Sequence, residues 1–248
     1  MTEEEFEQEV RFYQQAIMEA VAHTDSRGSW KDEVPELCAR FEALMRDDLA
    51  HFQRLCARLL EDEQREVRLG VMKLLCLFNV RDSDRIRNNK LSMLLMQIAL
   101  NQKDLREEAF SALWRVGTRL VLPQLLLFAE RGYSNALYMV RHMIRTPEEI
   151  ERWTAIARKY IDANDYPLRE AALFLLQKYS SMEREAECVL VAVQKHLDEL
   201  FIDALKEAPP EKVLASLKAL RSTIEAKYAE YGDLSSTIEV LEQKEQSR

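Results

Sequence analysis

Acidic side chains stand close together at several places along the chain, as general acid–base catalysis requires. The pairs are Asp47 with Asp48, Asp82 with Asp84, and Glu148 with Glu149. Each pair lies at a predicted turn or helix start, where a carboxylate interacts favourably with the helix dipole. Helix capping therefore explains these pairs, and the sequence predicts no catalytic residue.

Histidine and cysteine spacing does not favour a metal site. The histidines are His23, His51, His142 and His196, and the cysteines are Cys38, Cys56, Cys76 and Cys188. No two histidines stand four residues apart, and no cysteines form a CxxC pair. With only 5 glycines and no nucleotide-binding motif, the chain has little from which to build a phosphate-binding loop. We expect no metal and no cofactor, and we expect Cys38, Cys56 and Cys76 to be buried thiols.

Basic side chains are concentrated in the middle of the chain. Residues 1–80 carry 10 basic and 17 acidic side chains, residues 81–145 carry 11 and 6, and residues 146–248 carry 14 and 20. Arg141 and Arg145 stand four apart and are expected to share a helix face, with Tyr138 one turn earlier. The predicted partner-binding face consists of Arg81, Arg85, Arg87, Arg115, Arg119, Tyr138, Arg141 and Arg145.

The elements that carry these residues are predicted to be helices. The chain has 5 glycines and 6 prolines, far below the usual frequencies of about 7% and 5%, which argues against a sheet protein with many turns. Apolar residues spaced by three or four predict a helix over 3–23 and a helical pair over 34–60. A capping box at Thr146–Glu149 starts another helix, and a final pair is expected at 210–230 and 233–243. We expect all-α structure with about six to seven antiparallel helix pairs.

Three segments of the chain can be aligned with one another and predict a repeat. Each consists of an apolar helical stretch, an Asp or Asn expected to cap the next helix, and an apolar residue followed by arginine. The repeated positions are Asp62 and Arg68, Asn101 and Arg106, and Asn164 and Arg169. The last interval is the longest and is predicted to contain a degenerate unit around residues 133–144. Because one helix pair cannot bury its own apolar face, the units must stack on one another.

This repeat resembles the HEAT family over roughly residues 48–180. Residues 62–68 have that family's spacing, and Gly117 and Pro123 resemble the end and the start of helices at a HEAT junction. The resemblance implies a right-handed α-solenoid, and it implies that Arg68, Arg106 and Arg169 pair with turn acids to hold the repeats in register. We expect one domain over 1–248, with capping helices in 1–47, repeats in 48–180, C-terminal helices in 181–244 and a frayed tail in 245–248.

The predicted function is that of a non-enzymatic scaffold, adaptor or regulator. Its concave face would bind a protein partner through an acidic segment that meets the basic residues. The alternative is nucleic-acid binding, because the chain also resembles the HEAT-like alkyl-purine DNA glycosylases in size and architecture. That resemblance would give Trp114 and Trp153 a base-stacking role beside the arginines. The net charge of −8 argues against this alternative.

Targeting signals are not evident in the sequence. The N-terminus is acidic where a secretory signal would be basic and then apolar. The longest uncharged stretch, residues 91–101, is too short to cross a bilayer as a helix. We therefore expect a cytoplasmic protein with no membrane association.

Overall fold

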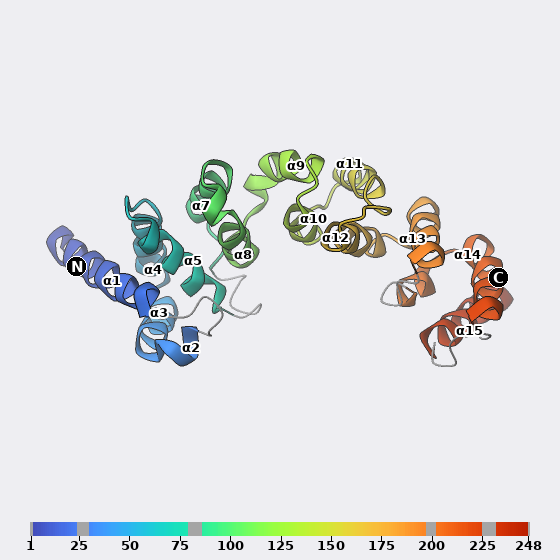
Figure 1. The fold of residues 1–248 in the computed structure, drawn as a ribbon, viewed down its shortest axis with the longest axis horizontal. Helices are drawn as coiled ribbons and strands as arrows, with labels where there is room; N and C mark the ends of the chain where they lie inside the picture. Colours follow the sequence, from blue (N-terminus) through green and yellow to red (C-terminus); the bar gives the residue numbers. More distant parts are fainter. Residues whose placement is uncertain (1, 24–29, 79–85, 197–201, 225–231, 248) are drawn as a thin grey trace. The chain divides into compact units, whose positions relative to one another are not determined.

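The computed structural model describes residues 2–23, 30–78, 86–196, 202–224 and 232–247 (Figure 1). All regular secondary structure in these ranges is helical, with fourteen α-helices and a few short 3-10 turns. The helices pack in sequential pairs, which confirms the predicted all-α class. Of the predicted site residues, Arg81 and Arg85 lie outside the described residues.

The chain forms two compact units, Met1–Gln124 and Leu125–Arg248. The first contains α1 (Glu3–His23), α2 (Trp30–Glu33), α3 (Pro35–Asp47), α4 (Leu49–Leu60), α5 (Arg65–Cys76), α7 (Asn89–Asn101) and α8 (Arg106–Val116). The second contains most of α9 (Leu122–Glu130), then α10 (Ser134–Val140), α11 (Pro147–Arg158), α12 (Tyr166–Gln177), α13 (Glu183–His196), α14 (Pro210–Ile224) and α15 (Gly232–Gln246). The sequence predicted one domain over 1–248, and its expected subdivisions at 47, 180 and 244 fall inside these units.

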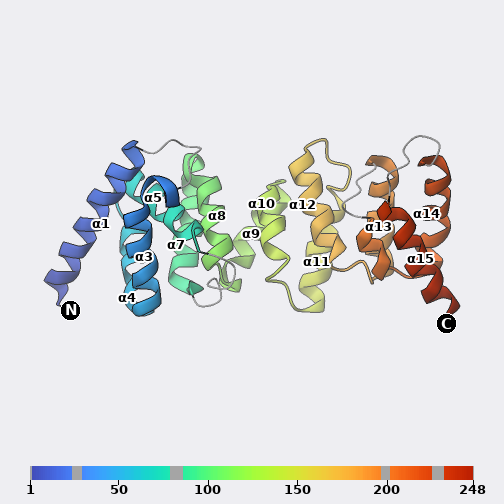
Figure 2. The same ribbon diagram turned by 90° about the horizontal axis from the view of Figure 1, so that it is seen from below.

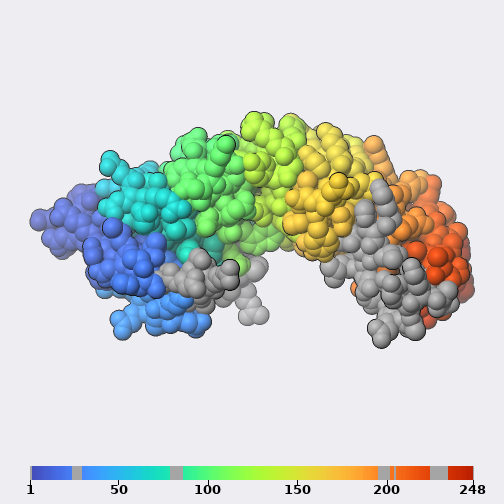
Figure 3. Space-filling model, in the orientation of Figure 1, coloured from blue at the N-terminus to red at the C-terminus, as the bar shows by residue number. Residues whose placement is uncertain are grey.

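In the first unit the helices pack on neighbours in sequence and on helices further along the chain. Helix α4 contacts α3, α5 and α7, while α5 contacts α1 and α8, and α7 lies beside α8 (Figure 2). Side chains fill the spaces between the ribbons (Figure 3). Phe41, Phe52 and Phe78 form the aromatic centre of this core, with ring centroids 4.9 to 6.0 Å apart. Burial of large apolar side chains at successive interfaces is the main stabilising contribution in such an arrangement.

Helix α1 packs its predicted apolar face against α4 and α5. Phe6, Val10, Tyr13 and Ile17 are buried as the periodicity predicted, and Ala20 completes the stripe where Val21 was expected. Helix α5 approaches α1 closely at Gly70, where an added Cβ would lie 2.1 Å from Ile17 Cγ2. Gly70 is therefore a close-packing site between two helices.

The structure does not place the three repeat residues at the helix caps predicted for them. Asp62 is buried, stands three residues before the start of α5, and accepts from the Gln64 N–H at 2.8 Å. Asn101 is the last residue of α7, and the 3-10 turn Lys103–Leu105 separates it from α8. Asn164 is exposed, and Asp165 caps α12 instead by accepting from the Leu168 N–H at 3.0 Å. The N-cap of α5 is Gln64, without a side-chain cap, so the capping prediction is wrong for Asp62, Asn101 and Asn164.

The repeated arginines bond to backbone carbonyls of the preceding turn, or in the case of Arg106 of the last turn of the preceding helix. Arg68 donates to the carbonyls of Asp62 and Glu63, the latter at 2.9 Å. Arg106 Nε donates to the Ala99 carbonyl at 2.8 Å, and Arg169 to the Ala163 carbonyl at 2.9 Å. A guanidinium that satisfies helix-end carbonyls fixes the angle between the paired helices.

The second unit continues the sequential packing. Helix α12 contacts α10, α11 and α13, and α14 contacts α13 and α15 (Figure 1). A helix, α10, lies where the degenerate unit was expected, around residues 133–144, and follows a turn at Gly132 with φ of 79°. The capping box at Thr146 and Glu149 is also confirmed. Helix α15 continues to Gln246, beyond the predicted end at 243.

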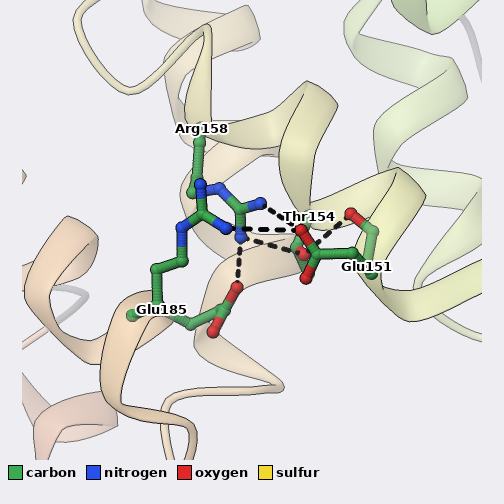
Figure 4. A network of polar contacts seen from close by, with 5 residues as sticks. Glu151, Thr154, Arg158 and Glu185 are labelled. Carbon is green, nitrogen blue, oxygen red and sulfur yellow. Dashed lines mark hydrogen bonds and ion pairs between the residues drawn. The ribbon is translucent and has the colours of Figure 1, made fainter. Parts of the chain in front are cut away.

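A buried charged network joins α11 to α13 (Figure 4). Glu185 is 1% exposed and pairs with Arg158 Nη1, while Arg158 Nη2 contacts Glu151 Oε1 at 2.9 Å. Arg158 also donates to Thr154 Oγ1 at 3.2 Å. Glu151, Thr154 and Arg158 stand three and four residues apart, so they share the face of α11 that meets α13.

Candidate functional site

The predicted basic residues of the first unit lie on chain segments that converge. Arg87 precedes α7, Arg115 is in the last turn of α8, and Arg119 is in the following 3-10 turn Arg119–Val121. These segments are joined by a hydrogen bond from the Asn88 N–H to the Val116 carbonyl at 3.2 Å. The structure therefore brings these three basic positions to the same end of the α7–α8 pair.

The prediction that Arg141 and Arg145 share a helix face is wrong. Helix α10 ends at Val140, and Arg145 immediately precedes the cap of α11. The Arg145 N–H donates to Glu149 Oε2 at 2.8 Å, because that carboxylate also closes the capping box. Arg145 is exposed and belongs to the turn between the two helices.

Arg141 instead packs against an aromatic side chain of α12. The guanidinium carbon of Arg141 lies 3.7 Å from the centroid of the Phe174 ring. The Tyr138 ring lies 5.6 Å from the same Phe174 ring, and its hydroxyl donates to Glu170 Oε2 at 2.7 Å. These residues come together because α10 packs against α12.

Lys178 adds a second cation at this place. Its ammonium group donates to the backbone carbonyl of Arg141 and lies 5.4 Å from the centroid of the Tyr179 ring. We refer to Tyr138, Arg141, Phe174, Lys178 and Tyr179 as the cationic–aromatic cluster. It contains two of the eight predicted site residues.

Neither cation of the cluster is neutralised by a carboxylate within the described part of the chain. No ion pair involves Arg141 or Lys178 there, and the Arg141 Nε is buried without an acceptor. Burial lowers the pKa of the Arg141 guanidinium. Burial, and then the positive charge of Arg141, lower the pKa of the Lys178 ammonium group. The protein holds these two like charges beside each other, with Arg141 half-buried and Lys178 exposed, and an anion would offset their repulsion.

The cluster has the chemistry of an anion-binding site with an apolar wall. A guanidinium binds carboxylates and phosphates through several N–H groups, and an ammonium group supplies a second charge. The half-buried Phe174 and Tyr179 rings offer apolar surface next to these charges. Burial also raises the pKa of the Tyr179 hydroxyl, which keeps it neutral and able to donate.

Sequence reasoning missed Phe174, Lys178 and Tyr179. Glu170, Phe174 and Lys178 stand four residues apart and follow one face of α12, a signal that the sequence contained. The sequence did not predict that α10 packs on that face of α12, because the degenerate repeat could not be aligned with the others.

Of the two tryptophans considered for base stacking, Trp153 is excluded by its burial. Trp153 is 3% exposed and belongs to the core. Trp114 is half-buried in α8. Stacking of bases requires an accessible ring face, which Trp153 does not offer.

His51 and the four cysteines, which could in principle do chemistry, have structural contacts instead. His51 Nε2 lies 2.6 Å from Glu9 Oε2 between α4 and α1. Cys38 and Cys56 are buried as predicted, while Cys76 and Cys188 are only half-buried, and all four are free thiols. Burial raises the pKa of Cys76 to about 11, so its reactive thiolate form is scarce near neutral pH.

The described ranges of the chain lack two kinds of feature. They contain no group of three or more His, Cys, Asp or Glu side chains placed to hold a metal ion. None of the helices described is both long and apolar enough to span a bilayer.

Comparisons with known proteins give a structural similarity only. No protein-family model matches the chain, and no curated protein matches it. The crystal structure of a protein described as engineered is similar, with 12% identity and a TM-score of 0.44. The alignment covers 92% of this chain and 96% of that one.

Proposed function

We propose that this protein is a non-enzymatic adaptor that binds an acidic segment of a protein partner at the cationic–aromatic cluster. The observation that carries the proposal is that Lys178 donates to the Arg141 carbonyl beside the Phe174 ring, so that two cations lie together without a described carboxylate partner. An acidic side chain would supply the missing counter-charge. Apolar residues beside it could pack on Phe174 and Tyr179.

The proposal includes a HEAT-type repeat as the scaffold and a cytoplasmic location. The shared role of Arg68, Arg106 and Arg169 at helix ends supports the HEAT assignment. Four free cysteines are consistent with a reducing compartment.

Affinity capture from a lysate of the native host, with and without nuclease, tests the proposal. The protein and a variant of the cluster are used as bait in parallel. Arg141→Met with Lys178→Met removes both charges while leaving unbranched chains to pack on the rings. Arg152→Met with Lys159→Met is a matched control, because both residues are exposed on α11 and lack a described ion pair. We expect a stoichiometric protein partner that survives nuclease and is weakened at least about tenfold by the site variant alone.

Two results would contradict the proposal. If the site variant and the control variant captured the partner equally well, the cluster would not be part of the interface. Capture that collapses on nuclease treatment would favour nucleic-acid binding, and duplex affinity falling steeply with salt would then establish it.

A further inference from the structure

A groove of about 540 Å³ lies in the first unit between α1 and the segment formed by α2 and α3. Its floor is apolar and consists of Phe12, Ala16, Ala20, Val34, Pro35 and Leu37. The walls are helices that the core already holds in place through the opposite face of α1 and through α3 packing on α4.

Helix α1 therefore presents two apolar faces. One is buried against α4 and α5 and includes Tyr13 and Ile17. The other follows Phe12 and Ala16 along the groove and reaches the buried stripe at Ala20, and Phe12 is 43% exposed. The first helix of a stacked array is expected to turn a polar face outward. Phe12 is part of a contiguous apolar surface with Val34, Pro35 and Leu37, and such contiguous patches mark surfaces that a partner covers.

The rim of the groove is acidic. Glu19 comes from α1, Glu33 from α2 and Glu36 from the first turn of α3. None of the three has an ion pair with a described residue. The opposing cation is Arg40, which also lines the groove and whose guanidinium carbon lies 4.1 Å from the Phe12 ring centroid.

The surroundings extend this negative field. Residues 1–47 contain 12 acidic and 5 basic side chains. A field of this sign attracts lysine and arginine and repels anionic phospholipid headgroups. It also repels an equally acidic N-terminal segment of a second copy.

We infer that this groove is a docking site for one amphipathic helix of a protein partner, with a large apolar side chain flanked by lysine or arginine. A groove walled by two helices suits an inserted helix whose apolar anchors are three and four residues apart. The anchor would pack on Phe12 and Leu37, and the basic side chains would meet Glu19, Glu33 and Glu36. This site is independent of the cationic–aromatic cluster and binds a partner of opposite charge.

Fluorescence anisotropy of two labelled synthetic peptides with the full chain tests the inference. One is an amphipathic leucine–lysine helix of about 14 residues, and the other has the same apolar face with glutamate in place of lysine. We expect saturable binding of the lysine peptide, weakened about tenfold by Phe12→Ala and by Glu36→Lys separately. The glutamate peptide should not bind.

Matched controls separate the groove from general charge attraction. Met18→Ala removes a side chain that is 37% exposed on α1 outside the groove, and Asp47→Lys reverses a charge at the far end of α3. Both should bind the lysine peptide as the unaltered protein does. The variant that removes Arg141 and Lys178 should do so too, which distinguishes this site from the cluster. If Phe12→Ala alters thermal unfolding, Ala16→Gln, which fills the floor instead, replaces it.

Three outcomes would overturn the inference. They are absence of saturation by the lysine peptide, equal weakening by Met18→Ala and Phe12→Ala, and binding of both peptides alike. A dimer in sedimentation velocity that Phe12→Ala dissociates would assign the groove to a second copy instead.

Discussion

At the residue scale, Gly70 shows how one missing side chain sets the distance between two helices. An alanine Cβ at this position would lie 2.1 Å from Ile17 Cγ2 and 3.1 Å from Trp30 Cη2. Alanine gains about 1 kcal/mol of helix propensity over glycine, but overpacking a filled core costs about 1–3 kcal/mol. Because Ile17 is β-branched and fully buried, it cannot move away by a simple rotamer change. We expect Gly70→Ala to destabilise the protein by about 1–2 kcal/mol in urea unfolding.

A second substitution separates this clash from other causes. Ile17→Leu removes the Cγ2 methyl group and keeps the side-chain volume. The double variant with Gly70→Ala should recover most of the lost free energy of unfolding. If Gly70→Ala is neutral, or if Ile17→Leu gives no recovery, then α1 and α5 are less closely packed at this point than the structure indicates.

At the element scale, the pair formed by Arg158 and Glu185 connects α11 to α13. Glu185→Ala leaves the Arg158 side chain, only 11% exposed, with Glu151 as its remaining acidic partner in the network. Breaking a buried ion pair from one side costs about 3–5 kcal/mol. Because the contact with Glu151 remains, we expect the free energy of unfolding to fall by about 3 kcal/mol. Glu187→Ala on the same helix is the control, since its contact with Lys212 is exposed and 4.0 Å long. The control should change the free energy of unfolding by less than about 0.5 kcal/mol.

Removing both charges distinguishes charge burial from packing. Arg158→Leu with Glu185→Leu leaves no uncompensated ion, and well-packed apolar replacements of buried pairs are often neutral. We expect the double variant to be more stable than Glu185→Ala in the same urea experiment. A double variant that is less stable would show that the network contributes through its geometry and hydrogen bonds.

At the scale of the whole molecule, the parts of the fold that were predicted are those set by neighbouring residues. Helix α1 has the predicted bounds because acidic residues in its first turn and a continuous apolar stripe define it locally. The capping box at Thr146 was recognisable for the same reason. The start of α8 was misplaced because a 3-10 turn of three residues, Lys103–Leu105, carries no distinct sequence signal.

The site depended on packing that no local signal encodes. Lys178 meets the Arg141 carbonyl across 37 residues of sequence, only because α10 lies on α12. Regional charge indicated the basic residues, and Tyr138 and Arg141 do come together. It could not indicate that Arg145 belongs to a turn, nor that Phe12 at the other end of the chain is exposed.

The division into two compact units predicts how destabilisation spreads through the chain. In a repeat protein each repeat contacts only the adjacent repeats. Local opening of one part of the chain therefore has its own free energy. Gly70→Ala should therefore raise amide hydrogen exchange within Met1–Gln124, and Glu185→Ala should raise it within Leu125–Arg248. A loss of about 1.4 kcal/mol corresponds to roughly tenfold faster exchange in the affected unit. Mass spectrometry of peptides from both units measures this, and equal acceleration in both units by either variant would show that the chain opens as one cooperative whole.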